Sequence, residues 1–191
     1  MCGIAGFTHF SGNMGDKYTL KKMGDSIYHR GPDAGGEYIN EHVGLAHRRL
    51  AIIDLSDAGI QPMTSHDGKY VIVFNGEIYN FQTIRDELNT AGYPFKTHTD
   101  TEVILALYAT EGEKMLSKLN GMFAFALWDT TSEKMMIARD RMGKKPLYYL
   151  QTETQFAFAS EIKALLTLPN VPRDIRLDAV YDFFAYQYIP D

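Results

Sequence analysis

The sequence predicts an α+β domain built on antiparallel sheets. Strand-like segments come first, two helices follow, and four further strand-like segments come after them, without the regular strand–helix alternation of parallel-sheet proteins. Short polar turns, such as the one at residues 129–132, separate the later strands, which predicts antiparallel meanders. The Gly35-Gly36 pair has no strand–loop–helix setting, so it is not a phosphate-binding loop.

The chain opens with an apolar strand, and a helix follows it. Apolar side chains alternate through the first seven residues, Met1-Cys2-Gly3-Ile4-Ala5-Gly6-Phe7, which favours a strand. After a polar turn, Asp16 is suited to cap a helix whose apolar residues recur at helical spacing, namely Leu20, Met23 and Ile27. The helix should end near Tyr28, because residues 29–33 contain a Gly-Pro pair.

Residues 36–54 are predicted to form two strands, the second of which carries adjacent arginines. Side chains alternate between the faces of a strand, so Arg48 and Arg49 point opposite ways while His47 and Arg49 share a face. This alternation favours one inward-pointing arginine. On local grounds alone, an edge strand with both arginine side chains in solvent is the preferred interpretation.

The next strand covers residues 70–74 and is followed by Asn75-Gly76 and an apolar segment at residues 77–79. Asn-Gly between apolar runs is the strongest local signal for a hairpin turn, since both residues tolerate positive φ. The sequence therefore predicts a turn at Asn75-Gly76.

Two helices are predicted after this strand. The first has Asn80 as its cap and stops at Gly92. The second opens at residues 98–102, where Thr99 or Asp100 is the expected N-cap.

Four strands are predicted in the second half of the chain, at residues 122–129, 134–139, 147–151 and 155–159. The charged segment at residues 139–146 is expected to be a solvated loop, and Ser160 is expected to cap a short helix over residues 161–168. A last helical run is predicted over residues 177–186. Residues 1–191 are interpreted as one domain, with residues 177–191 as the lead-in to a second domain absent from this sequence.

The composition excludes several classes of function. With 191 residues, of which 45% are hydrophobic, the chain has enough material for one globular core. A formal net charge of −5 disfavours nucleic-acid binding, and no apolar run reaches the roughly 20 residues that a membrane span needs. The six histidines show no metal-ligand spacing. A single cysteine and the lack of a secretory signal favour the cytoplasm.

Cys2 becomes the N-terminal residue if Met1 is removed. An α-amine titrates near ~7.7 to 8.0 and a thiol near ~8.5, so at neutral pH the amine is often able to accept the thiol proton, directly or through a water. An N-terminal cysteine therefore brings its own general base to a nucleophilic thiol. The alternative is a small residue that opens an apolar strand.

Seven motifs, in unbroken order from Met1 to about Ala164, together resemble the class II glutamine amidotransferases, in particular the glutaminase domain of glutamine-dependent asparagine synthetase. The motifs are MCGIAGF (1–7), HRGPD (29–33), AHRRLAIID (46–54), FNGEIYN (74–80), TDTEV (99–103), LNGMFAFALWD (119–129) and RDRMGKKPLYY (139–149).

The resemblance implies a fold, a reaction and a set of site residues. The fold is the N-terminal-nucleophile hydrolase fold, a four-layer αββα sandwich of two antiparallel sheets. The reaction is hydrolysis of the glutamine side-chain amide to glutamate and ammonia. Cys2 is the implied nucleophile, Asn75 and Gly76 the oxyanion hole, and the implied substrate-binding residues are Arg49, Leu50, Ile52, Glu77 and Asp100. Arg49 would hold the α-carboxylate of glutamine, and Asp100 and Glu77 its α-ammonium. Arg30 would support the site.

The implied partners follow from the same family. Glutamine is the substrate, and a C-terminal synthetase domain of the full-length protein receives the ammonia. The glutaminase domain needs no metal or cofactor, whereas ATP and Mg²⁺ belong to the synthetase domain, whose acceptor is aspartate. A sugar or a cell-surface polysaccharide precursor as acceptor, a different amide substrate, a non-catalytic module of the same fold and a homodimer remain alternatives.

Overall fold

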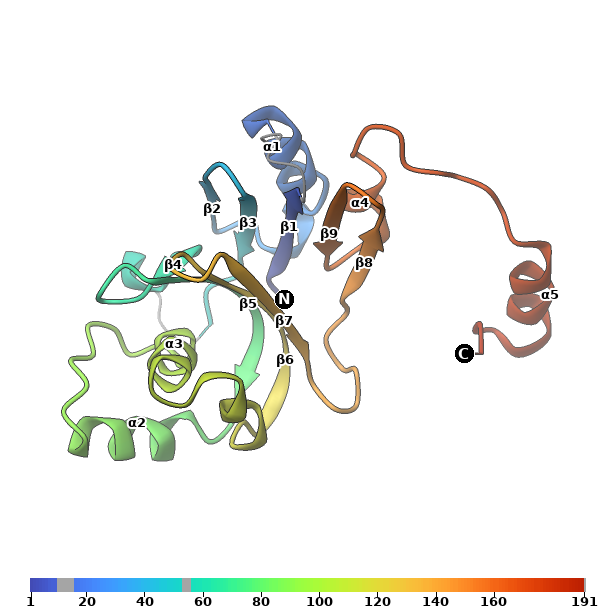
Figure 1. Cartoon of the computed structure of the whole chain (residues 1–191). Coiled ribbons are helices and arrows are strands. Elements are labelled where there is room, and N and C mark those ends of the chain that lie inside the picture. The colour runs from blue at the N-terminus through green and yellow to red at the C-terminus, as the bar shows by residue number, and fades with distance from the viewer. Residues whose placement is uncertain (10–15, 53–55, 191) are drawn as a thin grey trace.

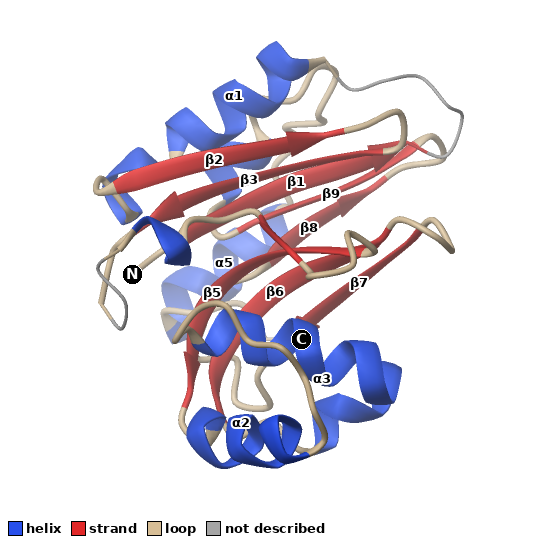
Figure 2. Cartoon of the chain, turned by 90° about the vertical axis from the view of Figure 1, so that its left-hand side faces the viewer, coloured by secondary structure: helices blue, strands red, loops and turns tan. Residues whose placement is uncertain are grey.

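Two antiparallel sheets lie face to face in the computed structural model, which describes residues 1–9, 16–52 and 56–190 (Figure 2). The five-stranded sheet has the order β2-β3-β1-β9-β8, with bounds β1 (Gly3–His9), β2 (Ala34–Ile39), β3 (Val43–Arg49), β8 (Tyr148–Gln151) and β9 (Gln155–Ala159). The four-stranded sheet has the order β4-β5-β6-β7, with bounds β4 (Met63–Thr64), β5 (Tyr70–Ile78), β6 (Gly121–Asp129) and β7 (Lys134–Arg139).

Helices cover the outer face of each sheet (Figure 1). The five-stranded sheet is covered by α1 (Lys17–Ser26) and α4 (Ile162–Leu165), and the four-stranded sheet by α2 (Phe81–Thr90) and α3 (Asp100–Glu111). Short 3₁₀ segments lie at Tyr28–Arg30, Asp57–Gly59 and Gly112–Ser117. The resulting order of layers confirms the αββα sandwich and the α+β class.

Each interface between layers has its own apolar cluster. The inter-sheet cluster contains Ile4, Leu45, Val73, Trp128 and Phe158, each no more than 2% exposed. Separate clusters lie under α1 with α4 and under α2 with α3. Burial of these apolar side chains is the main stabilising contribution to the sandwich.

The predicted helix caps are partly confirmed. The Asp16 carboxylate accepts a hydrogen bond from the Thr19 amide at the start of α1. Thr99, not Asp100, is the N-cap of α3, because its side chain accepts from the Glu102 amide at 3.2 Å. Ser160 caps no helix; its hydroxyl instead accepts from the Ile4 amide at 3.0 Å and joins β1 to the segment after β9.

The predicted hairpin turn at Asn75-Gly76 is wrong. Both residues lie inside β5, where Asn75 pairs with Ala124 and Gly76 with Phe123 of β6. A Cβ on Gly76 would lie 2.3 Å from the Met122 carbonyl oxygen, so the close approach of the neighbouring strand requires glycine here. Glycine serves this strand contact and not a positive φ.

The strand order corrects two further predictions, the edge strand at Arg48 and Arg49 and the solvated loop at residues 139–146. The strand that carries Arg48 and Arg49 is not an edge, because β3 pairs with β1 on one side and β2 on the other. The later strands form two hairpins in different sheets, β6-β7 and β8-β9. The segment between Arg139 and Tyr148 therefore crosses from one sheet to the other, and its Asp140 and Lys145 are buried.

The last helix, α5 (Leu177–Tyr186), stands apart from the sandwich at the end of an extended segment (Figure 1). None of its residues is buried, and Leu177 and Phe184 are 79% and 81% exposed. Among the described residues, no helix has the length and apolar character to cross a membrane.

Candidate active site

A cavity of about 320 Å³ opens at one end of the sandwich, where β1 begins and where β3 and β5 end. Its lining includes all eight residues that the sequence analysis assigned to the site, namely Cys2, Arg49, Leu50, Ile52, Asn75, Gly76, Glu77 and Asp100. Residues that are up to 98 positions apart, as Cys2 and Asp100 are, are thus brought together by the fold.

Strand alternation explains why the polar residues meet here. Ile4, Leu45 and Val73 face the inter-sheet core from β1, β3 and β5. Cys2 and Asn75 lie two positions from Ile4 and Val73 and therefore share their faces, because side chains alternate along a strand. Arg49 lies four positions from Leu45 and faces the same way. Its neighbour Arg48 points outward and donates to the Gly24 carbonyl oxygen of α1 at 3.1 Å.

The Cys2 thiol lies beside the backbone of Leu50. Its Sγ accepts from the Leu50 amide at 3.4 Å and donates to the Leu50 carbonyl oxygen at 3.6 Å. Burial raises the pKa of the Cys2 thiol, and the hydrogen bond with Leu50, the N-terminal charge and Arg49 oppose that rise. Met1 is present in this structure, so the α-amino group belongs to Met1 and Cys2 carries a peptide nitrogen.

Arg30 holds the backbone at Cys2 in place. Its Nε donates to the Cys2 carbonyl oxygen at 2.9 Å, and its guanidinium pairs with the Glu161 carboxylate at 3.1 Å. These two contacts join the first strand to the start of α4, which fits the supporting role expected for Arg30.

The side chain of Asn75 has an unused donor. Asn75 is 1% exposed, and among the described residues its Nδ2 has no hydrogen-bond partner. An unsatisfied buried amide costs about 1 to 3 kcal/mol, which a ligand oxygen would recover. The donor is therefore already in place for an acceptor that enters the cavity.

The backbone amide of Gly76 points the same way as two amides whose partners are known. Phe74 donates to Oε1 of Gln61 at 2.6 Å, and Ile78 donates to the Asp100 carboxylate at 3.1 Å. Backbone amides alternate with a period of two along a strand, so the Gly76 amide lies between these bonds on the same edge of β5. That edge faces the cavity, because both Gln61 and Asp100 line it.

The cavity contains charges of both signs. Arg49 is 8% exposed and donates through Nη1 to the Ser56 carbonyl oxygen at 2.7 Å. Asp100 is 4% exposed, and burial raises the pKa of its carboxyl to about 6, against the hydrogen bond from Ile78. Glu77 is exposed and contributes a second carboxylate. One cationic and one anionic group suit a zwitterionic amino acid.

Sequence reasoning did not single out Gln61 or Lys145. Gln61 accepts from Phe74 and donates through Nε2 to the Thr101 hydroxyl at 3.2 Å, which ties β5 to α3. No local pattern distinguishes this glutamine. Lys145 belongs to one of the seven motifs but was interpreted as part of a solvated loop; it is 5% exposed.

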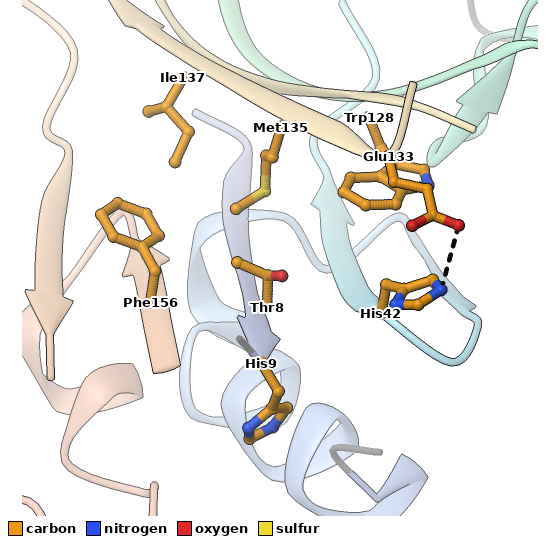
Figure 3. A pocket seen from close by; sticks show the side chains of 8 residues that line it. All are labelled: Thr8, His9, His42, Trp128, Glu133, Met135, Ile137 and Phe156. Atoms are coloured by element: carbon orange, nitrogen blue, oxygen red, sulfur yellow. Dashed lines mark ion pairs between the residues drawn. The ribbon is translucent and has the colours of Figure 1, made fainter. Parts of the chain in front are cut away.

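A larger cavity of about 580 Å³ lies at the opposite end of the inter-sheet space (Figure 3). Figure 3 shows apolar side chains along its walls and the 3.3 Å ion pair between His42 and Glu133 at its side. None of the predicted site residues lines it. The Cys2 thiol, the opposite charges of Arg49 and Asp100 and the unused donor of Asn75 all line the smaller cavity, which we therefore take as the candidate active site.

No metal centre accompanies this site in the described ranges 1–9, 16–52 and 56–190. Within them, no group of three or more His, Cys, Asp or Glu side chains is arranged to hold a metal ion.

Comparisons with known proteins cover the whole chain. Residues 1–191 match the family described as glutamine amidotransferase domain. The chain is 44% identical over 196 residues to glutamine-hydrolysing asparagine synthetase 1 of Bacillus subtilis (strain 168), covering 100% of this chain and 30% of that protein. It is 47% identical over 177 residues to glutamine-hydrolysing asparagine synthetase B of Escherichia coli (strain K12), covering 85% and 32% respectively. The chain thus spans about a third of the length of these curated relatives.

A solved structure shares the fold at low sequence identity. The chain superposes with a TM-score of 0.72 on the glutamine phosphoribosylpyrophosphate amidotransferase of B. subtilis, with 22% identity over 87% of this chain and 43% of that chain. The solved structure shows the common fold. The family match over the full length shows that the chain belongs to the class II glutamine amidotransferases.

Proposed function

We propose that this domain hydrolyses the side-chain amide of glutamine to glutamate and ammonia, with Cys2 as the nucleophile once Met1 has been removed. The observation that carries the proposal is the unpaired buried amide of Asn75 in the same cavity as the Cys2 thiol. A nucleophile beside a ready donor is the arrangement that acyl transfer requires.

Arg49 and Asp100 orient the substrate in this proposal. The guanidinium of Arg49 binds the α-carboxylate of glutamine, and the carboxylate of Asp100, with Glu77, binds the α-ammonium. Leu50 and Ile52 line the cavity beside Cys2 and Arg49 and complete the substrate contacts. This orientation directs the side-chain amide of glutamine toward the thiol.

The reaction proceeds in two halves. The freed α-amine of Cys2 takes the thiol proton, the thiolate attacks the amide carbon, and the oxyanion accepts hydrogen bonds from Asn75 Nδ2 and the Gly76 amide. The intermediate collapses to a thioester as ammonia leaves with a proton from the α-ammonium. Water, deprotonated by the same amine, then hydrolyses the thioester to glutamate and regenerates Cys2.

A direct assay tests this function. Protein that begins at Cys2 is incubated with glutamine without ATP or added metal, and glutamate and ammonia are measured. We expect equimolar release of both, and none from Cys2→Ala. A requirement for ATP or metal would overturn the mechanism, and turnover by Cys2→Ala would overturn the assignment of the nucleophile.

We further propose that the ammonia is used by a synthetase domain that follows residue 191, with aspartate, ATP and Mg²⁺ as the other reactants and asparagine as the product. Two observations support this: the relatives are about three times longer than this chain, and α5 exposes large apolar side chains such as Leu177 and Phe184. A sugar or a polysaccharide precursor is the alternative acceptor, and a second copy of the chain is the alternative cover for α5.

A reactive thiol is best preserved in a reducing compartment, which favours the cytoplasm.

Sequencing the gene beyond Asp191 separates these acceptors. A nucleotide-binding loop of the SGGxDS kind downstream, and asparagine formation by the full-length protein, are the expected results. Transfer of nitrogen to a sugar instead would overturn the aspartate assignment and leave glutamine hydrolysis intact.

A further inference from the structure

A buried lysine that the proposed mechanism does not use lines the active-site cavity. Lys145 is 5% exposed, and its side chain shares the cavity with Cys2, Glu77 and Asp100. Lysine is almost never buried without a partner, because desolvation of the ammonium is costly. Its place beside the nucleophile therefore needs an explanation.

The backbone around Lys145 is held in a fixed position. The carboxylate of Asp140 accepts from the amides of Met142, Lys144 and Lys145 at 3.1, 2.9 and 3.0 Å, and from that of Phe123 at 3.2 Å. The Nε of Arg139 donates to the Lys145 carbonyl oxygen at 2.6 Å. The crossing segment between the sheets thus fixes where the Lys145 side chain begins.

The ammonium of Lys145 contacts the residue that precedes the nucleophile. Its Nζ lies 3.1 Å from Sδ of Met1, a weak acceptor, and among the described residues Lys145 forms no ion pair. Removal of Met1 eliminates this contact. The removal creates an α-amino group on Cys2, which lines the same cavity as Lys145.

The charged groups around Lys145 act on the pKa of its ammonium. Burial lowers the pKa of the Lys145 ammonium and the nearby Arg30 guanidinium lowers it further, while Cys2, Glu77 and Asp140 oppose the shift. Arg49 lowers the pKa of the Cys2 thiol and Asp100 raises it. Lys145 is thus a cation that lines the same cavity as Cys2 and forms no ion pair among the described residues.

We propose that Lys145 is an electrostatic positioning residue: its ammonium keeps the freed α-amine of Cys2 unprotonated and so sets the lower pH limit of glutamine hydrolysis. Two cations in one desolvated cavity repel each other, so the protonated form of the amine is disfavoured. The same cation favours the Cys2 thiolate. This inference rests on the proposed function, since it concerns the amine as the catalytic base.

The test compares variants of the protein that begins at Cys2. Lys145→Met keeps the length of the side chain and removes the charge; Lys145→Gln serves if that variant does not fold, and Lys145→Arg restores the charge. In Lys145→Met and Lys145→Gln, we expect the midpoint of the acid limb of the kcat/KM profile for glutamine to move up by about one pH unit. At pH values below this midpoint, kcat/KM should fall about tenfold, and it should recover at high pH. The profile of Lys145→Arg should stay close to that of the parent protein.

Lys144→Met is the matched control, because it removes the same charge from an exposed neighbour outside the cavity. Its profile should match that of the parent. The rate of Cys2 alkylation by iodoacetamide across pH gives a readout that does not depend on glutamine, and it should shift in the same direction as the acid limb.

The outcomes are separable. An unshifted acid limb and an unshifted alkylation profile in a folded Lys145→Met would overturn the role of Lys145 and leave the proposed function standing. A parent protein that alkylates normally but does not hydrolyse glutamine would instead overturn the proposed function. A uniform loss of activity at all pH values would indicate a purely structural lysine and also contradict the proposal.

Discussion

The carboxylate of Asp100 accepts a hydrogen bond from the backbone amide of Ile78 at 3.1 Å, which joins the start of α3 to the end of β5. The carboxylate is nonetheless poorly solvated, and burial raises its pKa from 3.8 to about 6. A carboxyl group with a raised pKa binds more protons in the folded than in the unfolded state between these two values. Its contribution therefore makes the free energy of unfolding fall as pH rises from about 4 to about 6.

Asp100→Asn should accordingly stabilise the fold at pH 7 and weaken glutamine binding. The shift of about 2 pH units corresponds to roughly 3 kcal/mol that ionised Asp100 costs the folded state, and the asparagine oxygen still accepts from Ile78. Urea unfolding at pH 4 and pH 7 checks this: the gain should be present at pH 7 and nearly absent at pH 4. Calorimetry should show at least a ~30-fold loss of glutamine affinity.

Asp174→Asn, at an exposed position, is the control and should change neither quantity. In the parent protein, KM for glutamine should rise as pH falls below about 6, because the protonated carboxyl no longer binds the substrate ammonium. If Asp100→Asn destabilised the protein at pH 7 while glutamine affinity stayed the same, Asp100 would be a structural residue.

Retention of Met1 should abolish glutamine hydrolysis without unfolding the protein. The nitrogen of Cys2 is then an amide, which is no base, and Met1 is one of the residues that line the cavity that would receive glutamine. The cleanest comparison uses one preparation with an N-terminal tag, assayed before and after a protease cleaves directly ahead of Cys2. Mass spectrometry verifies the terminus. Full turnover by the tagged form would contradict the terminal base.

Asn75→Ala should lower kcat for glutamine about 10²- to 10³-fold with little change in KM, because the donor acts on charge that develops only in the transition state. The stability of the fold should change little, since Nδ2 has no partner to lose among the described residues. Steady-state kinetics and a thermal melt measure both effects. Asn89→Ala, an exposed position on α2, is the control. A large rise in KM with unchanged kcat would place Asn75 in ground-state binding instead.

Much of the fold could be predicted because local patterns agree with the tertiary structure. Residues 134–139, 155–159 and 177–186 were expected as two strands and a helix, and β7, β9 and α5 have those bounds. The cap at Asp16 is equally local. The prediction of a turn at Asn75-Gly76 was wrong because Gly76 is required by the close approach of the Met122 carbonyl oxygen on the neighbouring strand. No local sequence pattern contains that contact.

Some residues of the candidate site could likewise be predicted from the sequence, and others could not. Strand alternation placed His47 and Arg49 on one face, and both are buried, with Nε2 of His47 3.1 Å from the Phe74 carbonyl oxygen of the facing sheet. The family resemblance supplied the eight residues that line the cavity. Gln61 and Lys145 could not be found in this manner. Gln61 acts through bonds to two other elements, and Lys145 is buried in a segment that crosses between the sheets, which no local pattern indicates.

The last prediction separates substrate binding from chemistry at Arg49 and Cys2. Arg49→Ala removes the cation proposed to hold the α-carboxylate but leaves the thiol intact, whereas Cys2→Ala removes the nucleophile and no recognition group. Loss of a desolvated charge contact costs about 2 to 5 kcal/mol, so glutamine should bind Arg49→Ala roughly 30-fold to several thousand-fold more weakly. Arg49→Ala should still be alkylated at Cys2 by iodoacetamide, and Cys2→Ala should bind glutamine measurably without turning it over.

Calorimetry on both variants and alkylation of Arg49→Ala measure these effects, and Arg48→Ala is the matched control because its side chain points to α1 and away from the cavity. Arg49 also donates to the Ser56 carbonyl oxygen, so a thermal melt must establish that Arg49→Ala is folded before its affinity is interpreted. Near-parental glutamine affinity in folded Arg49→Ala, with Arg48→Ala unchanged, would show that Arg49 serves the fold alone. The charge of Arg49 would then no longer favour glutamine over other amide substrates.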